Sequence, residues 1–99
     1  MLIRTQDKRS LVDMTGLTIT INQYKKLVCQ IGHEDTPQEI YHYHIEYPQG
    51  NLQGILGIYS TELKATKVLD VIQEKYEEAN NYYVRNTVFA MPADEEVEV

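Results

Sequence analysis

Residues 54–78, GILGIYSTELKATKVLDVIQEKYEE, decide the predicted fold. The apolar run at 55–59 is typical of a central strand that is covered on both faces. Ser60 or Thr61 follows, and either hydroxyl can accept an N–H group at the start of a helix. Apolar side chains then recur at helical spacing, at Ala65, Val68, Leu69, Ile72 and Tyr76. We therefore predict one amphipathic helix that ends at the asparagine pair 80–81.

The remaining segments predict strands. Alternation of apolar and polar residues is clearest at 17–21 and 27–31, which we expect to form an antiparallel hairpin around a turn at 22–26. Further strands are expected at 2–5, 10–14, 39–47 and 82–91. The prediction is an α+β fold, with an antiparallel β-sheet of about five to seven strands and one amphipathic α-helix packed on one face. Residues 1–92 are expected to form a single domain, followed by a flexible acidic tail at 93–99.

Composition indicates a small protein with one domain. The chain has 99 residues, a net charge of −6 and a single cysteine, Cys29. A lone cysteine forms no internal disulfide, and its apolar neighbours favour a buried thiol, so we expect a cytoplasmic protein. No apolar run is long enough for a membrane span, and the charged N-terminus does not predict a signal peptide. The acidic balance disfavours binding to nucleic acid or to an anionic membrane.

Few residues are candidates for catalysis or metal binding. His42 and His44 share one face of a predicted strand. With His33 or Glu46, this pair would offer ligands to a metal ion, although a His-x-His pair on a strand is more often plain surface. The apolar context of Cys29 argues against a reactive thiolate. No segment has the glycine spacing of a phosphate-binding or dinucleotide-binding loop. We therefore predict no enzyme activity, no cofactor and no bound metal.

Two groups of side chains are candidates for binding a partner protein. Three tyrosines lie on one face of the strand at 39–47 and are expected to anchor the partner: Tyr41, Tyr43 and Tyr47. Acidic residues of the helix and the tail are expected to contact a basic groove: Glu74, Glu77, Glu78, Asp94, Glu95 and Glu96. Such a complex should weaken as the salt concentration rises. If 39–47 is an edge strand, extension of the sheet would also give a homo-oligomer.

Three segments together resemble a known group of proteins. They are LIRTQDK at 2–8, LGIYST at 56–61 with the helix that follows, and VFAMP at 88–92. In these segments the chain resembles small, uncharacterised proteins encoded by phages and prophages of Gram-positive bacteria. The resemblance carries over no functional residue. It implies a setting in which small acidic proteins often inhibit host defence by binding.

Three functional hypotheses follow. The first is a non-enzymatic protein that binds a host protein stoichiometrically in the host cytoplasm, for example as an anti-CRISPR inhibitor of a defence nuclease with a basic groove. The second is a binding protein that sequesters a nucleotide signal, with anion contacts from Arg4, Lys8, Arg9 and Arg85. The third is a structural or assembly role in the phage particle, which predicts higher-order oligomers.

Overall fold

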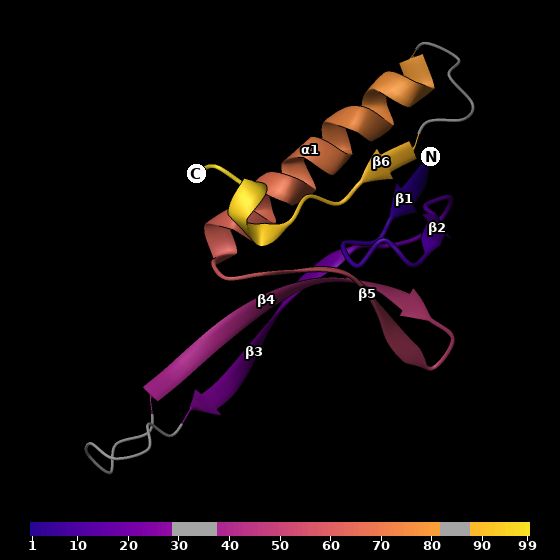
Figure 1. Cartoon of the computed structure of the whole chain (residues 1–99). Coiled ribbons are helices and arrows are strands. Elements are labelled where there is room, and N and C mark those ends of the chain that lie inside the picture. The colour runs from indigo at the N-terminus through magenta and orange to yellow at the C-terminus, as the bar shows by residue number, and fades with distance from the viewer. Residues whose placement is uncertain (29–37, 82–87) are drawn as a thin grey trace.

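The computed structural model describes residues 1–28, 38–81 and 88–99, and it confirms the α+β class. The described residues form one long helix, six strands and one short 3-10 helix (Figure 1). In chain order these elements are β1 Leu2–Arg4, β2 Leu11–Asp13, β3 Thr20–Val28, β4 Gln38–Gln49, β5 Leu52–Tyr59, α1 Glu62–Asn81, β6 Val88–Ala90 and η1 Asp94–Glu96.

The strands form two separate sheets, whereas the sequence predicted a single antiparallel sheet of about five to seven strands. The small sheet has the order β2-β1-β6, and the large sheet has the order β3-β4-β5. Strand β1 pairs antiparallel with β2 but parallel with β6. The parallel pair is possible because the whole chain from β2 to α1 lies between β1 and β6, which is much longer than the connection that parallel strands need (Figure 1). Each strand of the small sheet has three residues, too few to pair along the whole length of β3 or β4.

Strand β3 runs straight through the turn that the sequence predicts at 22–26. All nine of its residues pair with β4 in one continuous antiparallel register. The predicted hairpin of 17–21 with 27–31 is therefore wrong where the structure describes it. The polar residues of this segment fit into a strand because alternate side chains lie over the polar side of β4, where they find hydrogen-bond partners.

The predicted strand at 39–47 is confirmed as part of β4, which occupies the centre of the large sheet. Both of its edges are paired, one with β3 and the other with β5. It therefore offers no edge for extending the sheet to a second copy. Among the described strands of the large sheet, β3 and β5 hold the outer positions.

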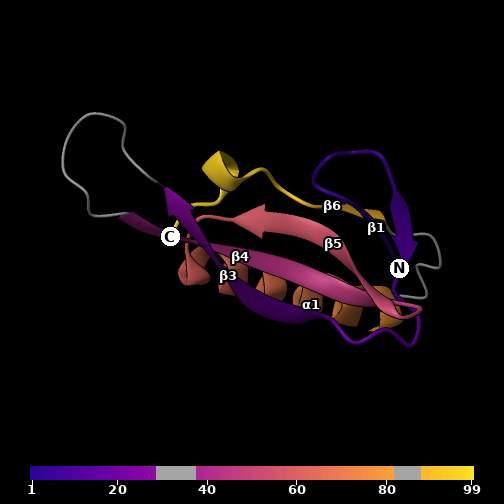
Figure 2. The ribbon, with the colours of Figure 1, turned by 90° about the horizontal axis from the view of Figure 1, so that it is seen from below.

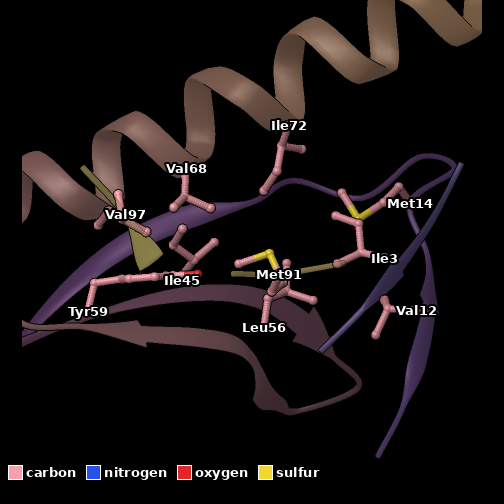
Figure 3. Packing of buried hydrophobic residues seen from close by; sticks show 11 residues of the cluster. Ile3, Val12, Met14, Ile45, Leu56, Tyr59, Val68, Ile72, Met91 and Val97 are labelled. Atoms are coloured by element: carbon pink, nitrogen blue, oxygen red, sulfur yellow. The ribbon is translucent and has the colours of Figure 1, made fainter. Parts of the chain in front are cut away.

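The core lies between α1 and one face of the large sheet (Figures 1 and 3). Ile45 of β4 points to this side, directly opposite Ile21 of β3 and Gly57 of β5. The small sheet and the C-terminal segment add side chains to the same cluster. Its buried members are Ile3, Val12, Met14, Ile45, Leu56, Tyr59, Ala65, Val68, Ile72, Met91 and Val97. Burial of each large aliphatic side chain contributes about 1.5–3 kcal/mol, so this cluster is the main source of tertiary stability.

Helix α1 begins and ends where the sequence predicts. Thr61 Oγ1 accepts the backbone N–H of Lys64 at 3.1 Å, which is the bond expected of an N-cap residue. Glu62 lies in the first turn, where the helix dipole favours a negative charge. The helix ends at Asn81, within the predicted asparagine pair. Tyr76 departs from the pattern, because its side chain stays 44% exposed although it was expected on the buried stripe.

The C-terminal segment packs onto the domain, whereas we expected a flexible tail at 93–99. The short helix η1 lies beside the start of α1 (Figure 1). The Asp94 carboxylate accepts the backbone N–H of Ser60 at 2.8 Å and its hydroxyl at 3.0 Å. Lys64 Nζ donates to the backbone carbonyl of Asp94 at 2.9 Å, and Val97 joins the buried cluster. These contacts attach the segment to the first turn of the helix and give Asp94 a structural role.

Candidate protein-binding surface

One side of the large sheet faces away from α1, and no described element covers it (Figure 2). The even-numbered residues of β4 point to this side, together with their partners on β3 and β5. We call this surface the open face and define it by Asn22, Tyr24, Ile40, His42, His44, Glu46, Ile55 and Ile58.

Large apolar side chains are exposed on the open face. The exposed fractions are 43% for Tyr24, 41% for Ile40, 45% for Ile55 and 38% for Ile58. The sequence predicted that 55–59 is covered on both faces, and this is wrong for the open face. An exposed isoleucine by itself is ordinary, but several on one uncovered sheet face form the kind of patch that marks interaction sites.

A buried carboxylate lies within this apolar surface. Glu46 is only 3% exposed, although it points away from the core. Asn22 Nδ2 donates to its Oε1 atom at 2.5 Å. The Tyr24 hydroxyl donates to the same carboxylate and lies 2.8 Å from Oε1 and 2.9 Å from Oε2. This hydrogen bond raises the pKa of Tyr24, and burial of the phenol adds to the shift. Two residues from the edge strand β3 thus hold an acid of the central strand.

His44 lies beside this acid and under the same tyrosine. Its ring centroid is 4.3 Å from that of Tyr24, with the two planes tilted by 38°. Its Nδ1 atom is 3.8 Å from Glu46 Oε2, which is too long for a hydrogen bond. Nδ1 is buried and has no hydrogen-bond partner among the described residues. Burial lowers the pKa of His44, and this effect outweighs the Glu46 carboxylate, which raises it. The neutral imidazole is therefore favoured.

The grooves found in the described part of the chain lie away from the open face. Catalytic groups and small ligands prefer concave pockets. Two grooves border the described core, but both lie at α1 on the other side of the sheet. One, of about 390 Å³, lies between α1 and the C-terminal segment and includes Val71 and Phe89 in its lining. The other, of about 360 Å³, lies between α1 and the N-terminal segment and includes Leu17 and Leu69. No residue of the open face lines either groove.

The metal-binding hypothesis gains no support from the described residues. Within them, no three side chains of histidine, cysteine, aspartate or glutamate lie close enough together to hold a metal ion. His33 and Cys29 lie outside the described residues. The expectation that the protein binds no metal therefore stays a prediction.

The predicted tyrosine anchors lie on the opposite side of the large sheet from the open face. Tyr43 and Tyr47 are partly buried and pack against the core cluster. The ring of Tyr47 lies directly over Gly54, where an added Cβ atom would come within 2.3 to 2.6 Å of the ring atoms. Tyr41 is 37% exposed on the same side. Two of the three tyrosines thus contribute to packing.

The predicted acidic residues form two groups rather than one continuous surface. Glu74, Glu77 and Glu78 are exposed in the second half of α1, whereas Asp94, Glu95 and Glu96 lie in η1, at the start of the helix. At 1.5 Å per residue, Lys64 at the η1 group and Glu77 are about 20 Å apart along the axis. Lysine side chains also pair within each group: Lys64 with Asp94 and Lys75 with Glu78, each at 3.5 Å.

The cations of the nucleotide hypothesis lie at the small sheet. Arg4 is exposed on its outer side, opposite Leu11 of β2 and Ala90 of β6. Lys8 and Arg9 are exposed in the turn that joins β1 to β2, and Lys8 has a left-handed backbone with φ of 66°. Arg85 lies outside the described residues.

Sequence reasoning missed two central residues of the open face, Asn22 and Tyr24, because it assigned them to a turn. The available signal was the alternation on β4, which predicted a polar side with His42, His44 and Glu46. A polar side of a central strand needs hydrogen-bond partners on its neighbours. The need for hydrogen-bond partners could therefore have predicted that the polar segment 22–26 forms a strand beside β4.

Comparisons with known proteins give no indication of function, so the functional argument rests on the residues of this chain. No protein-family model, no curated protein and no solved structure matches this chain. In the described part of the chain, no helix combines the length and the apolar character that a membrane span requires.

Proposed function

We propose that this protein acts by stoichiometric binding to another protein and that the open face is its contact surface. The observation that carries the proposal is the exposure of Tyr24, Ile40, Ile55 and Ile58 on one uncovered side of a sheet. Removal of apolar surface from water contributes about 25 cal/mol per Å², so a partner that covers these side chains gains binding free energy.

The rigidity of the surface supports the same proposal. The exposed side chains lie on paired strands: β3 pairs with β4 without interruption, and β5 pairs with β4 on both sides of a register shift between Ile45 and Glu46. A preorganised surface loses little conformational entropy when a partner binds. Tyrosine is also enriched in protein interfaces, because its ring contributes a large contact area at a small entropic cost.

The kind of partner follows from the resemblance to phage and prophage proteins. On that basis we propose a host protein as the target and inhibition of a host defence system, such as a CRISPR nuclease, as the outcome. The binding surface that supports this role is the open face rather than the acidic residues of α1 and η1. No catalytic step is part of the proposal.

The experiment compares two variants of β5 in capture from a Gram-positive host lysate. The double variant Ile55→Thr with Ile58→Thr removes apolar surface while it keeps charge and strand propensity. The control Leu52→Thr makes the same kind of change at a side chain that is 75% exposed at the start of the strand and outside the open face. Both variants are first checked for the wild-type circular dichroism spectrum.

The proposal predicts that wild type and Leu52→Thr capture the same single protein at a one-to-one ratio. The double variant should bind it at least about tenfold more weakly, since buried apolar contacts at the centre of an interface each contribute about 1 kcal/mol or more. Equal capture by all three proteins would refute the open face as the contact surface.

A second candidate function, sequestration of a nucleotide signal, is favoured by one observation. The exposed Arg4 guanidinium has no ion pair or hydrogen bond among the described residues, and Leu11 beside it is 55% exposed. A cation next to an apolar side chain suits an anion that carries a base. Thermal unfolding with millimolar cyclic nucleotides tests this function. A rise in melting temperature that Arg4→Ala removes would support it, and unchanged melting would exclude it for those nucleotides.

A further inference from the structure

We infer that the partner of the open face places an arginine or lysine side chain over Tyr24 and Glu46. This inference rests on the proposed function and adds the chemistry of the partner. It starts from an unusual pair of exposures on the open face. The Glu46 side chain is charged but only 3% exposed, whereas the apolar side chains around it are about 40% exposed. A charge in such a place needs compensation before its surroundings can be covered.

The described residues give Glu46 only part of that compensation. A carboxylate can accept about four hydrogen bonds. Asn22 and Tyr24 donate one each, and both donors are neutral. His44 is the only basic side chain of the described residues within 4 Å of the carboxylate, and its Nδ1 atom makes no hydrogen bond there. The acid therefore retains acceptor capacity, and no lysine or arginine of the described residues neutralises it.

Docking makes this deficit more severe. A partner that covers Ile55 and Ile58 also covers Glu46, because Ile55 lies directly opposite Glu46 in the sheet register and Ile58 lies opposite its neighbour His44. The remaining screening by water is then lost, and an uncompensated buried charge is strongly unfavourable. A partner without a cation at this point would bind more weakly, because the Glu46 charge would be buried without compensation. A partner with one gains a charge-assisted hydrogen bond.

Tyr24 provides the second half of the recognition site. Its hydroxyl donates to Glu46 while its side chain stays 43% exposed. A guanidinium or ammonium group over an aromatic ring is attracted by the ring, and this attraction increases when water is excluded. One basic side chain can therefore contact the exposed ring and approach the carboxylate beneath its hydroxyl. Apolar residues beside it would contact the isoleucines.

A second copy of this chain is a poor occupant by the same reasoning. Two open faces in contact would bring together two Glu46 carboxylates, and among the described side chains no lysine or arginine lies within 4 Å of either carboxylate in its own copy. Each copy also carries a net charge of −6. Face-to-face self-association is therefore disfavoured, and a basic foreign surface is favoured.

The test uses two blocked peptides that differ only in charge, acetyl-Val-Arg-Val-amide and acetyl-Val-citrulline-Val-amide. Citrulline keeps the shape of arginine but is neutral. Each is titrated into the full chain labelled with nitrogen-15, and the amide shifts are followed by NMR. The variants are Glu46→Gln, which removes the charge at nearly constant volume, and Tyr24→Phe, which keeps the ring.

We expect the arginine peptide to shift the amides around Tyr24, His44 and Ile58, with an affinity at least about fivefold above that of the citrulline peptide. Glu46→Gln should abolish this preference. Tyr24→Phe should retain it, because the ring remains and the carboxylate loses a neutral donor. An amide spectrum like that of the wild type shows that an unbound variant is folded. If Glu46→Gln fails this check, the comparison of the two peptides on the wild-type chain still decides the test.

Equal affinity for the two peptides at the open face would overturn the inference but leave the proposed function standing. Shifts confined to Glu74 and Glu77 of α1 would overturn it too, because they would show non-specific attraction to acidic side chains. If neither peptide shifts the open face and the Ile55→Thr, Ile58→Thr variant still captures its partner, both the inference and the proposed function are wrong.

Discussion

The side-chain amide of Gln6 pairs with the backbone of Ile58 in the way a neighbouring strand would. The Ile58 N–H donates to Gln6 Oε1 at 2.9 Å, and Gln6 Nε2 donates to the Ile58 carbonyl at 3.1 Å. The same Nε2 group donates to the carbonyl of Pro92 at 3.1 Å, and the backbone N–H of Gln6 donates to Leu56 at 2.8 Å. The single residue Gln6, which follows β1, thus joins the edge of the large sheet to the small sheet and to the C-terminal segment.

Gln6→Ala should lower the free energy of unfolding by about 1–3 kcal/mol, because it leaves the Ile58 backbone groups and the Pro92 carbonyl without this partner. Urea unfolding followed by circular dichroism measures the change. Gln73→Ala is the matched control, since Gln73 makes one exposed hydrogen bond to Glu77 within α1. A Gln6→Ala protein as stable as the control would show that the two sheets hold together without this contact.

Asp94 should stabilise the fold above its pKa. The backbone N–H of Ser60, the Ser60 hydroxyl and Lys64 all hold the pKa of Asp94 below its usual value of 3.8. The stabilisation is therefore complete above about pH 4 and is lost as the pH falls through the lowered pKa of the folded state. Asp94→Asn should lower the unfolding free energy by about 1 kcal/mol at pH 7. The difference from wild type should disappear in strong acid.

The control for Asp94 is Glu95→Gln, at an exposed neighbour in η1. It should change the unfolding free energy by less than about 0.5 kcal/mol at pH 7. An Asp94→Asn effect that stays constant from neutral to strongly acidic pH would contradict the electrostatic account and indicate a packing defect.

Tyr47 should matter for stability and not for partner binding. Its ring packs against the core cluster and over Gly54. Tyr47→Ala should therefore lower the unfolding free energy by about 1–3 kcal/mol, as expected for a partly buried aromatic side chain. Tyr76→Ala, at a position that is 44% exposed, should cost less. Urea unfolding gives both values, and capture from lysate by the folded fraction of Tyr47→Ala should match wild type. A stable variant with lost capture would restore the anchoring role that the sequence suggested.

His44 should make the fold sensitive to mild acid. Its pKa in the folded state is lowered from 6.5 by burial, so the unfolded chain takes up a proton more readily than the folded one. Stability is therefore full above about pH 6.5 and decreases as the pH falls from there towards the lowered pKa. His44→Gln should flatten this part of the profile, whereas His42→Gln on the same strand should keep most of it, because burial is the main cause of the lowered His44 pKa and the charge of His42 is the smallest. Unfolding by urea between pH 5 and 8 measures all three proteins.

The helix and the central strand could be predicted from the sequence because their signals are local. Apolar residues at helical spacing placed Ala65, Val68 and Ile72 on one face of α1, and the Thr61 hydroxyl marked its start. Period-two alternation likewise placed Ile45 and Glu46 on opposite sides of β4. These patterns depend only on residues within a few positions of one another. To assign an anchoring role to Tyr41, Tyr43 and Tyr47, one must also know which side of the sheet is buried. No local sequence pattern contains that information.

The amino-acid sequence by itself determined the α+β class, the helix at 62–81, and the residues that share a face of β4. Only the tertiary structure decided that β6 lies parallel to β1, that Val97 enters the core, and that Tyr24 covers Glu46. The physical reason is the distance along the chain. A helix forms from contacts between residues three or four positions apart, whereas the bond between Tyr24 and Glu46 joins residues 22 positions apart. Such contacts depend on the packing of the whole domain, which determines the strand that lies alongside and the face that stays open.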